Sequence, residues 1–272
     1  MLECVVNISE GRRATVVAAV AAAAGGDLLD VHTDADHNRS VLTLVGEDAP
    51  RAVATTAARL VDLSAHEGVH PRFGAFDVVP FVALTGTTPA DALAARDRFI
   101  AWVAATLGVP AFAYGPERTL PDVRRHAFRG LSPTAGPDRP HPTAGATAVG
   151  ARPLLVAWNV WLAEPDVALA RRIAAAVRGP HLRALGLPVA GGAQVSMNLV
   201  DPDVIGPAEA WDRVAAHAPV RRAELVGLVP AAVLARTDQS RWEQLDLAED
   251  RTIEHRLAQR GRKRGRATRR GR

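Results

Sequence analysis

Hydrophobic and polar positions in the first 84 residues follow the order strand, helix, strand, strand, helix, strand. Residues 2–8 alternate like a strand, and residues 14–24 form a helix of small apolar side chains that two glycines end. The expected elements that follow are strands at 28–32 and 41–46, a helix at 50–63 and a strand at 76–84. This order predicts one β-α-β-β-α-β unit.

The same order recurs later in the chain. Strands are expected at 154–162, 181–187, 194–199 and 223–229, with helices at 166–177 and 206–216. Between the repeats lie a helix at 89–107, a short strand at 111–114, a short helix near 121–129 and an irregular Pro-, Gly- and Thr-rich segment at 131–147. The pattern predicts an α+β protein with two ferredoxin-like subdomains and a ligand cleft between them.

Composition is typical of a globular protein in a reducing compartment. The chain has 272 residues, of which 48% are hydrophobic, and a single cysteine, which excludes an internal disulfide framework. No signal peptide and no apolar run long enough to span a bilayer is evident, so a cytoplasmic protein without membrane contact is expected. A homodimer is the expected assembly.

Positive charge is concentrated at the C-terminus. Residues 251–272 contain 10 of the 33 basic residues and one acidic residue, and without them the chain has 23 basic and 28 acidic residues. Glycines interrupt this tail and few apolar residues could fold it, so disorder is expected from about residue 251. Any binding of nucleic acid is expected to be non-specific and to use this tail, although a solvated end without a partner is the simpler interpretation.

The densest group of ionisable residues is the segment 66–77. His66-Glu67-x-x-His70 matches the zinc-protease pattern, which requires both histidines on one helix face. However, Gly68 and Pro71 disfavour that helix, and no third ligand follows at a recognisable spacing, so no metal site is expected. A loop with this many ionisable side chains favours a functional role over a plain connection.

The most specific motif of the chain is His70-Pro71-Arg72-x-Gly74-Ala75-x-Asp77. Further motif segments follow in a fixed order at 3–12, 29–31, 38–39, 136–137, 145–147, 150–152, 157–159, 194–199 and 224–230. Together these ordered motifs resemble those of the formiminotransferase family. The resemblance implies an N-terminal subdomain at 1–149, a C-terminal subdomain at 150–236 and an extension at 237–272 that lacks the cyclodeaminase domain of larger relatives.

The resemblance also implies an activity. Family members transfer the formimino group of N-formimino-L-glutamate to N5 of the co-substrate tetrahydrofolate during histidine degradation. The family's catalytic histidine matches His70, and a group that titrates near neutrality can take the proton from N5 and return it to the leaving nitrogen. Asp77 either orients that imidazole or caps the loop.

Other residues are candidates for binding substrates. Arg39 and Arg72 suit carboxylates, although each could instead form a structural ion pair, and Asn38 lies beside Arg39. His32 stands where vertebrate bifunctional members have an acidic residue. The family's two folate loops match residues Gly136, Pro137, Asp138, Arg139, Pro140, His141 and Pro142, and residues Arg178, Gly179 and His181.

Two alternatives remain open at this level. One keeps the same cleft and His70 but uses 5-formyltetrahydrofolate or another formimino donor. The other is a non-enzymatic protein that binds folate or nucleic acid.

Overall fold

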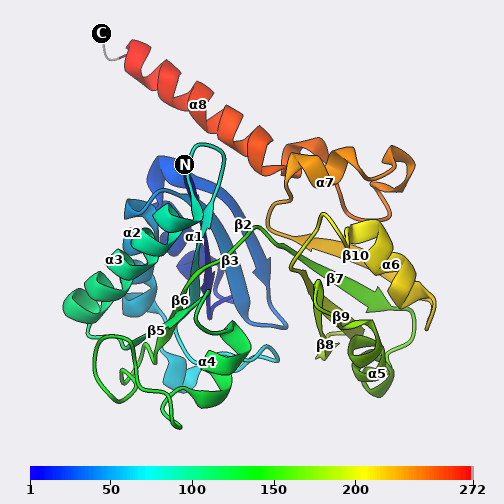
Figure 1. The fold of residues 1–272 in the computed structure, drawn as a ribbon, viewed down its shortest axis with the longest axis horizontal. Helices are drawn as coiled ribbons and strands as arrows, with labels where there is room; N and C mark the ends of the chain where they lie inside the picture. The colour runs from blue at the N-terminus through cyan, green and yellow to red at the C-terminus, as the bar shows by residue number, and fades with distance from the viewer. Residues whose placement is uncertain (271–272) are drawn as a thin grey trace. The chain divides into compact units, whose positions relative to one another are not determined.

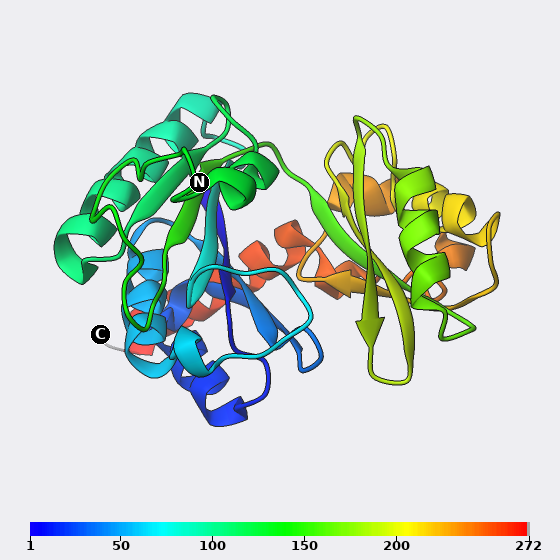
Figure 2. The ribbon, with the colours of Figure 1, turned by 90° about the horizontal axis from the view of Figure 1, so that it is seen from below.

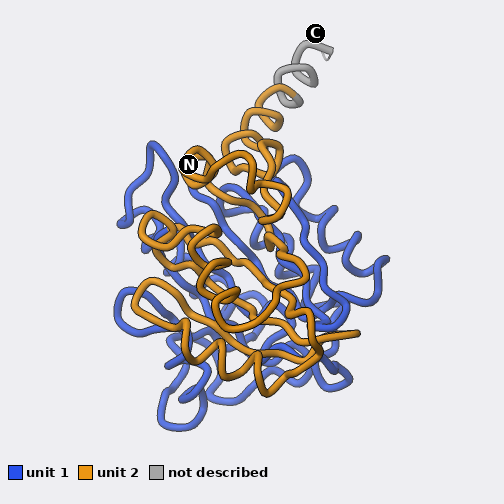
Figure 3. Tube along the Cα trace, turned by 90° about the vertical axis from the view of Figure 1, so that its right-hand side faces the viewer, with its two compact units in different colours: residues 1–153 blue, residues 154–272 orange. Residues whose placement is uncertain are grey.

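The structure is a computed structural model that describes the backbone of residues 1–270 and the side chains through Arg262. The chain forms two compact units that divide between Pro153 and Leu154 (Figure 3). The element order β-α-β-β-α-β occurs once in each unit, as predicted. The protein is therefore an α+β protein with two subdomains.

Unit 1, residues 1–153, contains a six-stranded sheet with the order β2-β3-β1-β4-β6-β5 (Figure 1). The strands are β1 (Leu2–Ile8), β2 (Leu28–Asp34), β3 (Arg39–Val45), β4 (Phe76–Ala83), β5 (Ala111–Tyr114) and β6 (Thr147–Ala151). The first four form antiparallel pairs, whereas β6 pairs in parallel with both β4 and β5. Strand β6 was not expected.

Three helices of unit 1 pack with the sheet around one hydrophobic core: α1 (Ala14–Ala23), α2 (Asp48–Leu60) and α3 (Pro89–Leu107). Thr88 and Asp91 form a capping box at the start of α3, and Gly108 ends that helix in the left-handed conformation. A second, smaller cluster contains Val78 of β4 and Val123 of the short helix α4 (Leu120–His126). Strand β4 thus packs on both faces.

Unit 2 begins at Leu154 and contains an antiparallel sheet with the order β10-β7-β9-β8. The strands are β7 (Val156–Leu162), β8 (Leu182–Val189), β9 (Gly192–Leu199) and β10 (Val220–Val226). Helices α5 (Val167–Val177) and α6 (Pro207–Ala215) lie on one face of this sheet (Figure 2). Gly186 of β8 allows this packing, since a Cβ there would lie 2.3 Å from the Arg171 nitrogen of α5.

The C-terminal extension is more ordered than expected. After α7 (Ala231–Ala235), helix α8 runs from Ile253 to Arg270, within the segment for which disorder was expected from about residue 251. Ile253 is buried and its nitrogen donates to the Val229 carbonyl oxygen, while the Val229 nitrogen donates to the Arg251 carbonyl oxygen. The Arg251 side chain donates to the Leu225 carbonyl oxygen at 2.6 Å. These contacts give the helix a fixed start. Residues 271–272, which the same prediction included, lie outside the described residues.

None of the described helices is both long enough and apolar enough to cross a membrane.

Candidate active site

The loop between α2 and β4 contains the histidine motif in an extended conformation. A 3₁₀ turn at Leu63–Ala65 ends before His66, whose backbone is extended (φ −94°, ψ 127°). The helix that the zinc-protease pattern requires is therefore absent from residues 66–70. Over the part of the chain with described side chains, no group of three or more His, Cys, Asp or Glu residues could hold a metal ion.

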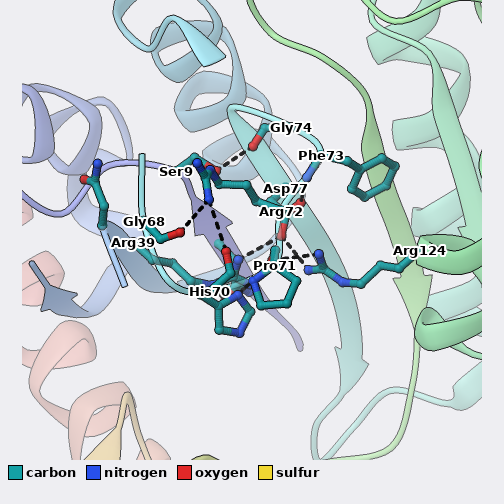
Figure 4. Close-up of polar contacts among 12 residues, drawn as sticks. Ser9, Arg39, Gly68, His70, Pro71, Arg72, Phe73, Gly74, Asp77 and Arg124 are labelled. Carbon is teal, nitrogen blue, oxygen red and sulfur yellow. Dashed lines mark hydrogen bonds and ion pairs between the residues drawn. The ribbon is translucent and has the colours of Figure 1, made fainter. Parts of the chain in front are cut away.

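Arg72 holds this loop in shape. Its guanidinium donates hydrogen bonds to the carbonyl oxygens of Gly68 at 2.9 Å and His70 at 3.3 Å (Figure 4). It also donates to the carbonyl oxygen of His66 at 2.5 Å. One side chain thus satisfies three carbonyl groups of an irregular segment. These contacts are structural, but they are hydrogen bonds to carbonyl groups and not the ion pair considered for Arg72. A carboxylate of the substrate would share a guanidinium that is already engaged.

Asp77 lies at a β-bulge, where the register between β1 and β4 shifts. A bulge changes the direction of a side chain, and here the fully buried Asp77 carboxylate accepts hydrogen bonds from the Phe73 backbone, Arg39 and Arg124. Burial raises the pKa of Asp77, but the charges of Arg124 and Arg39 together with the hydrogen bond from the Phe73 nitrogen hold that pKa below its usual value. Asp77 is an ionised cap of the loop.

Arg39 joins this carboxylate to β1. Its Nη1 donates to Asp77 at 2.8 Å, and its Nε and Nη2 donate to the side-chain oxygen of Asn7 at 3.2 and 2.9 Å. Burial lowers the pKa of Arg39. The ion pair with Asp77 is the structural alternative considered for this arginine. Asn7 was part of the family motif, but its local sequence did not indicate this contact.

His70 occupies the edge of the same network. Its Nδ1 lies 2.8 Å from the Pro71 carbonyl oxygen, and its ring centre lies 5.6 Å from that of His37. The expectation that Asp77 orients the imidazole directly does not match this geometry, since His70 Nδ1 contacts the Pro71 carbonyl oxygen and the Asp77 carboxylate binds Phe73 and two arginines. Burial lowers the pKa of His70 well below its ordinary value, and the charges of Arg39 and Arg124 lower it further.

Arg124 is a site residue that sequence reasoning missed. It comes from α4, and it donates to the Pro71 carbonyl oxygen and to Asp77, while its Cζ lies 5.9 Å from the centre of the Phe73 ring. Its position in a short basic run, Arg124-Arg125-His126, gave no signal that one arginine turns toward the histidine loop.

The β2–β3 turn also contacts the loop, through Asn38. Asn38, at a positive φ of 47°, accepts a hydrogen bond from the Gly11 nitrogen and donates to the Glu67 carbonyl oxygen. His66 Nε2 lies 2.9 Å from the Asn38 carbonyl oxygen. These contacts make Asn38 a link between three segments. His32 lies in β2 opposite Val41.

The first expected folate segment, residues 136–142, ends beside the histidine loop. The His141 imidazole accepts a hydrogen bond from the Ala144 nitrogen, and backbone hydrogen bonds join Leu63 to Thr143 and Ala75 to Ala144. Residues 136–140 are exposed. Unit 1 therefore brings His141 and the histidine loop into one connected region.

The second expected folate segment belongs to unit 2. Gly179 pairs with Leu182 in an isolated bridge, Arg178 donates to the Ala184 carbonyl oxygen at 2.7 Å, and His181 lies 3.2 Å from the Asp201 carboxylate. These residues form a turn of their own at the start of β8.

Comparisons with known proteins agree on one family. Residues 1–152 match the model of the formiminotransferase domain, N-terminal subdomain. The chain is 34% identical to glutamate formimidoyltransferase of Streptococcus pyogenes, in an alignment that covers 86% of this chain and 90% of that protein. It is 33% identical to glutamate formimidoyltransferase of Thermoplasma acidophilum, covering 86% of this chain and 89% of that protein.

Longer relatives are matched over part of their length. The chain is 34% identical to the formimidoyltransferase-cyclodeaminase of Sus scrofa, in an alignment that covers 94% of this chain but 55% of that protein. This chain thus spans about half the length of the bifunctional relative.

Proposed function

The chain belongs to the formiminotransferase family, and we propose that it transfers the formimino group of N-formimino-L-glutamate to N5 of tetrahydrofolate. Because the chain belongs to this family, it is a transferase of folate one-carbon metabolism. The products of the proposed reaction are 5-formiminotetrahydrofolate and L-glutamate, and the reaction would serve histidine degradation. A cytoplasmic location and a homodimer stay predictions.

The observation that carries the proposal is the state of His70. A carbonyl oxygen can only accept a hydrogen bond, so the contact with Pro71 requires a hydrogen on Nδ1 and leaves the Nε2 lone pair available. Because the pKa of His70 is lowered, the imidazole is neutral at pH 7. A neutral histidine with one free basic nitrogen is ready to accept a proton.

In the proposed mechanism, N5 of tetrahydrofolate attacks the formimino carbon and forms a tetrahedral adduct. Nε2 of His70 accepts the proton that N5 loses. When the adduct collapses, the bond from carbon to the glutamate nitrogen breaks, and the imidazolium returns the proton to that nitrogen. The histidine ends the cycle in its starting state.

We assign the remaining candidates to binding. Residues 136–142 and the turn at Arg178, Gly179 and His181 would contact tetrahydrofolate, and Asn38, Arg39, Arg72 and His32 would lie near the donor. The contacts of Arg39 and Arg72 within the loop support a second role, in which these guanidinium groups hold the site in shape.

A steady-state assay on purified protein tests the proposal. Tetrahydrofolate is combined with N-formimino-L-glutamate or with N-formimino-L-aspartate, and in a separate assay 5-formyltetrahydrofolate is combined with glutamate as the formyl acceptor. Each assay is run with and without a chelator. We expect turnover with N-formimino-L-glutamate that the chelator does not change. Turnover only with another donor would replace the proposed substrate, and loss of activity in chelator would contradict the metal-free mechanism.

A further inference from the structure

The Pro71 carbonyl oxygen is shared by two groups in the site. His70 Nδ1 lies 2.8 Å from it, and Arg124 Nη1 donates to it at 2.8 Å (Figure 4). We propose that Arg124 is a positioning residue for His70, because its guanidinium holds the carbonyl group that selects the imidazole tautomer. This inference rests on the proposed role of His70 as the base.

Arg124 holds the loop at two points on either side of Arg72. Nη1 donates to the Pro71 carbonyl oxygen, and Nη2 donates to one oxygen of the Asp77 carboxylate at 2.5 Å. The other oxygen of that carboxylate accepts a hydrogen bond from the Phe73 nitrogen at 2.8 Å. A planar guanidinium donates in two fixed directions, so the carbonyl group and the carboxylate are fixed relative to one another. The loop cannot rotate the Pro71 peptide without breaking one of these contacts.

The element that carries Arg124 is itself anchored. The Thr119–Asp122 capping box fixes the start of α4, and Val123 is fully buried in the smaller apolar cluster of unit 1. Arg124 follows directly after this buried residue and reaches a carbonyl group 53 positions away in the chain. Helix α4 therefore gives the loop a support that the loop's own sequence does not contain.

The consequence for His70 is chemical. A neutral imidazole carries one hydrogen, and the acceptor of Nδ1 decides which nitrogen holds it. If the Pro71 carbonyl group turns away, the hydrogen can move to Nε2, and that nitrogen can no longer accept the proton from N5. A fixed acceptor thus keeps the basic nitrogen on the proposed reacting side.

Electrostatics adds a second effect of the same residue. After burial, Arg39 and then Arg124 contribute most to lowering the pKa of His70, whereas Asp77 raises it. Without the Arg124 charge, the pKa of His70 rises, and the acid limb of the kcat/KM profile moves to higher pH.

The test compares Arg124→Gln and Arg124→Lys with Arg125→Gln as a matched control. Arg125 is the next residue of α4, its side chain is 68% exposed, and its contact is a 3.9 Å ion pair with Asp122. Lysine keeps the charge but lacks the planar fork, so Arg124→Lys separates geometry from charge.

The direct measurement is the tautomer. In protein labelled with ¹⁵N-histidine, the ring nitrogen shifts of His70, assigned with His70→Ala, report which nitrogen carries the hydrogen. We expect Nδ1–H in the unaltered protein and in Arg125→Gln, and a mixture of tautomers in Arg124→Gln and Arg124→Lys. An unchanged Nδ1–H tautomer in both Arg124 variants would overturn the proposal.

Kinetics gives an independent reading. We expect kcat to fall by up to about 10²-fold in Arg124→Gln with little change in KM, since misplaced catalytic groups have effects of this size. The acid limb should move to higher pH in Arg124→Gln and move less in Arg124→Lys. If Arg124→Gln does not fold, Arg124→Lys carries both tests.

The two proposals fail in different ways. If His70→Ala keeps full turnover, the proposed base is wrong, whatever the tautomer measurement shows. If His70→Ala is inactive but both Arg124 variants keep the wild-type tautomer, kcat and pH profile, His70 stands as the base and Arg124 is excluded as its positioning residue.

Discussion

The two units differ most in the connection that leads to the last strand of each β-α-β-β-α-β repeat. In unit 1, residues 61–75 connect α2 to β4 and include His66, His70 and Arg72. In unit 2, the equivalent connection from α6 to β10 is residues 216–219, a short turn with one histidine, His217. The same element order therefore accommodates a plain turn in one unit and, in the other, the loop to which we assign the catalytic histidine.

The long connection is stabilised differently from the short one. Polar contacts from Asn38, Arg72 and Asp77 hold the histidine loop, whereas Ala218 of the short turn is buried and Ala163 donates to the Pro219 carbonyl oxygen. A polar network can hold ionisable groups without burying them in an apolar core. One copy of the scaffold thus has a long polar connection at the position where the other copy has a short turn.

The largest effect is expected from replacing the histidine of the long connection. His70→Ala should lower kcat by about 10²–10⁴-fold, the usual contribution of a general acid–base group. The matched control is His217→Ala, which changes the exposed histidine of the short connection and should leave kcat unchanged. Steady-state kinetics and folate binding by calorimetry check this. Equal activity of the two variants would contradict the assignment of the catalytic histidine to the long connection.

Glycine substitutions should distinguish a change in the histidine loop, which affects kcat, from a change in the scaffold, which affects stability. A Cβ at Gly68 would lie 2.4 Å from the His37 carbonyl oxygen, and a Cβ at Gly186 would lie 2.3 Å from the Arg171 nitrogen. Overpacking costs about 1–3 kcal/mol where the backbone cannot move. We expect Gly186→Ala to lower the free energy of unfolding by that amount, whereas Gly68→Ala should displace the loop and lower kcat more than stability.

Urea unfolding and kinetics on both variants measure the two effects. The comparison fails if Gly186→Ala reduces kcat at constant stability, or if Gly68→Ala destabilises the protein without affecting kcat.

The pH dependence should reflect His70, the half-buried histidine of unit 1. The folded-state pKa of His70 lies well below its ordinary value of 6.5, so the base stays neutral in mildly acidic solution and the acid limb of kcat/KM lies below pH 6.5. As pH falls below 6.5, the unfolded chain binds a proton that the folded chain does not, so the folded state loses stability until His70 itself is protonated.

Profiles of kcat/KM and of urea midpoints against pH test this. His217→Ala should keep both profiles, and His70→Ala should weaken the pH dependence of stability. An acid limb above pH 6.5 would mean that His70 is not shifted as the structure requires.

The smallest effect is expected at the C-terminus. Deleting residues 262–272 removes seven basic residues but keeps Arg251, Thr252 and Ile253, which contact the rest of unit 2. We expect the free energy of unfolding to change by less than about 0.5 kcal/mol, as for surface changes, with kcat unchanged. Any retention on a polyanion column should be lost.

Deleting residues 251–272 is the contrasting variant. Its loss of buried Ile253 and of the Arg251 contacts should destabilise unit 2, so it cannot report on the tail alone. Reduced kcat in the shorter deletion would show that the basic segment takes part in the reaction.

Local patterns in the sequence were sufficient to predict most elements. The periodicity of apolar residues and the Gly, Pro and Thr signals at element ends give the order of both repeats, and the density of ionisable groups draws attention to residues 66–77. These signals act within a few residues, so one sequence is enough to read them. The motif around His70 was specific enough to predict the family.

Tertiary structure alone decided the contacts that make the site. Strand β6 has five small residues and packs on both faces, so no alternation marked it, and α8 begins where Ile253 is buried against a distant segment. Arg124 lies 47 positions from Asp77, and the acceptor of His70 Nδ1 is a backbone carbonyl that no side-chain pattern encodes. The sequence determined which groups are present, but folding determined which groups meet, because those distances depend on long-range packing.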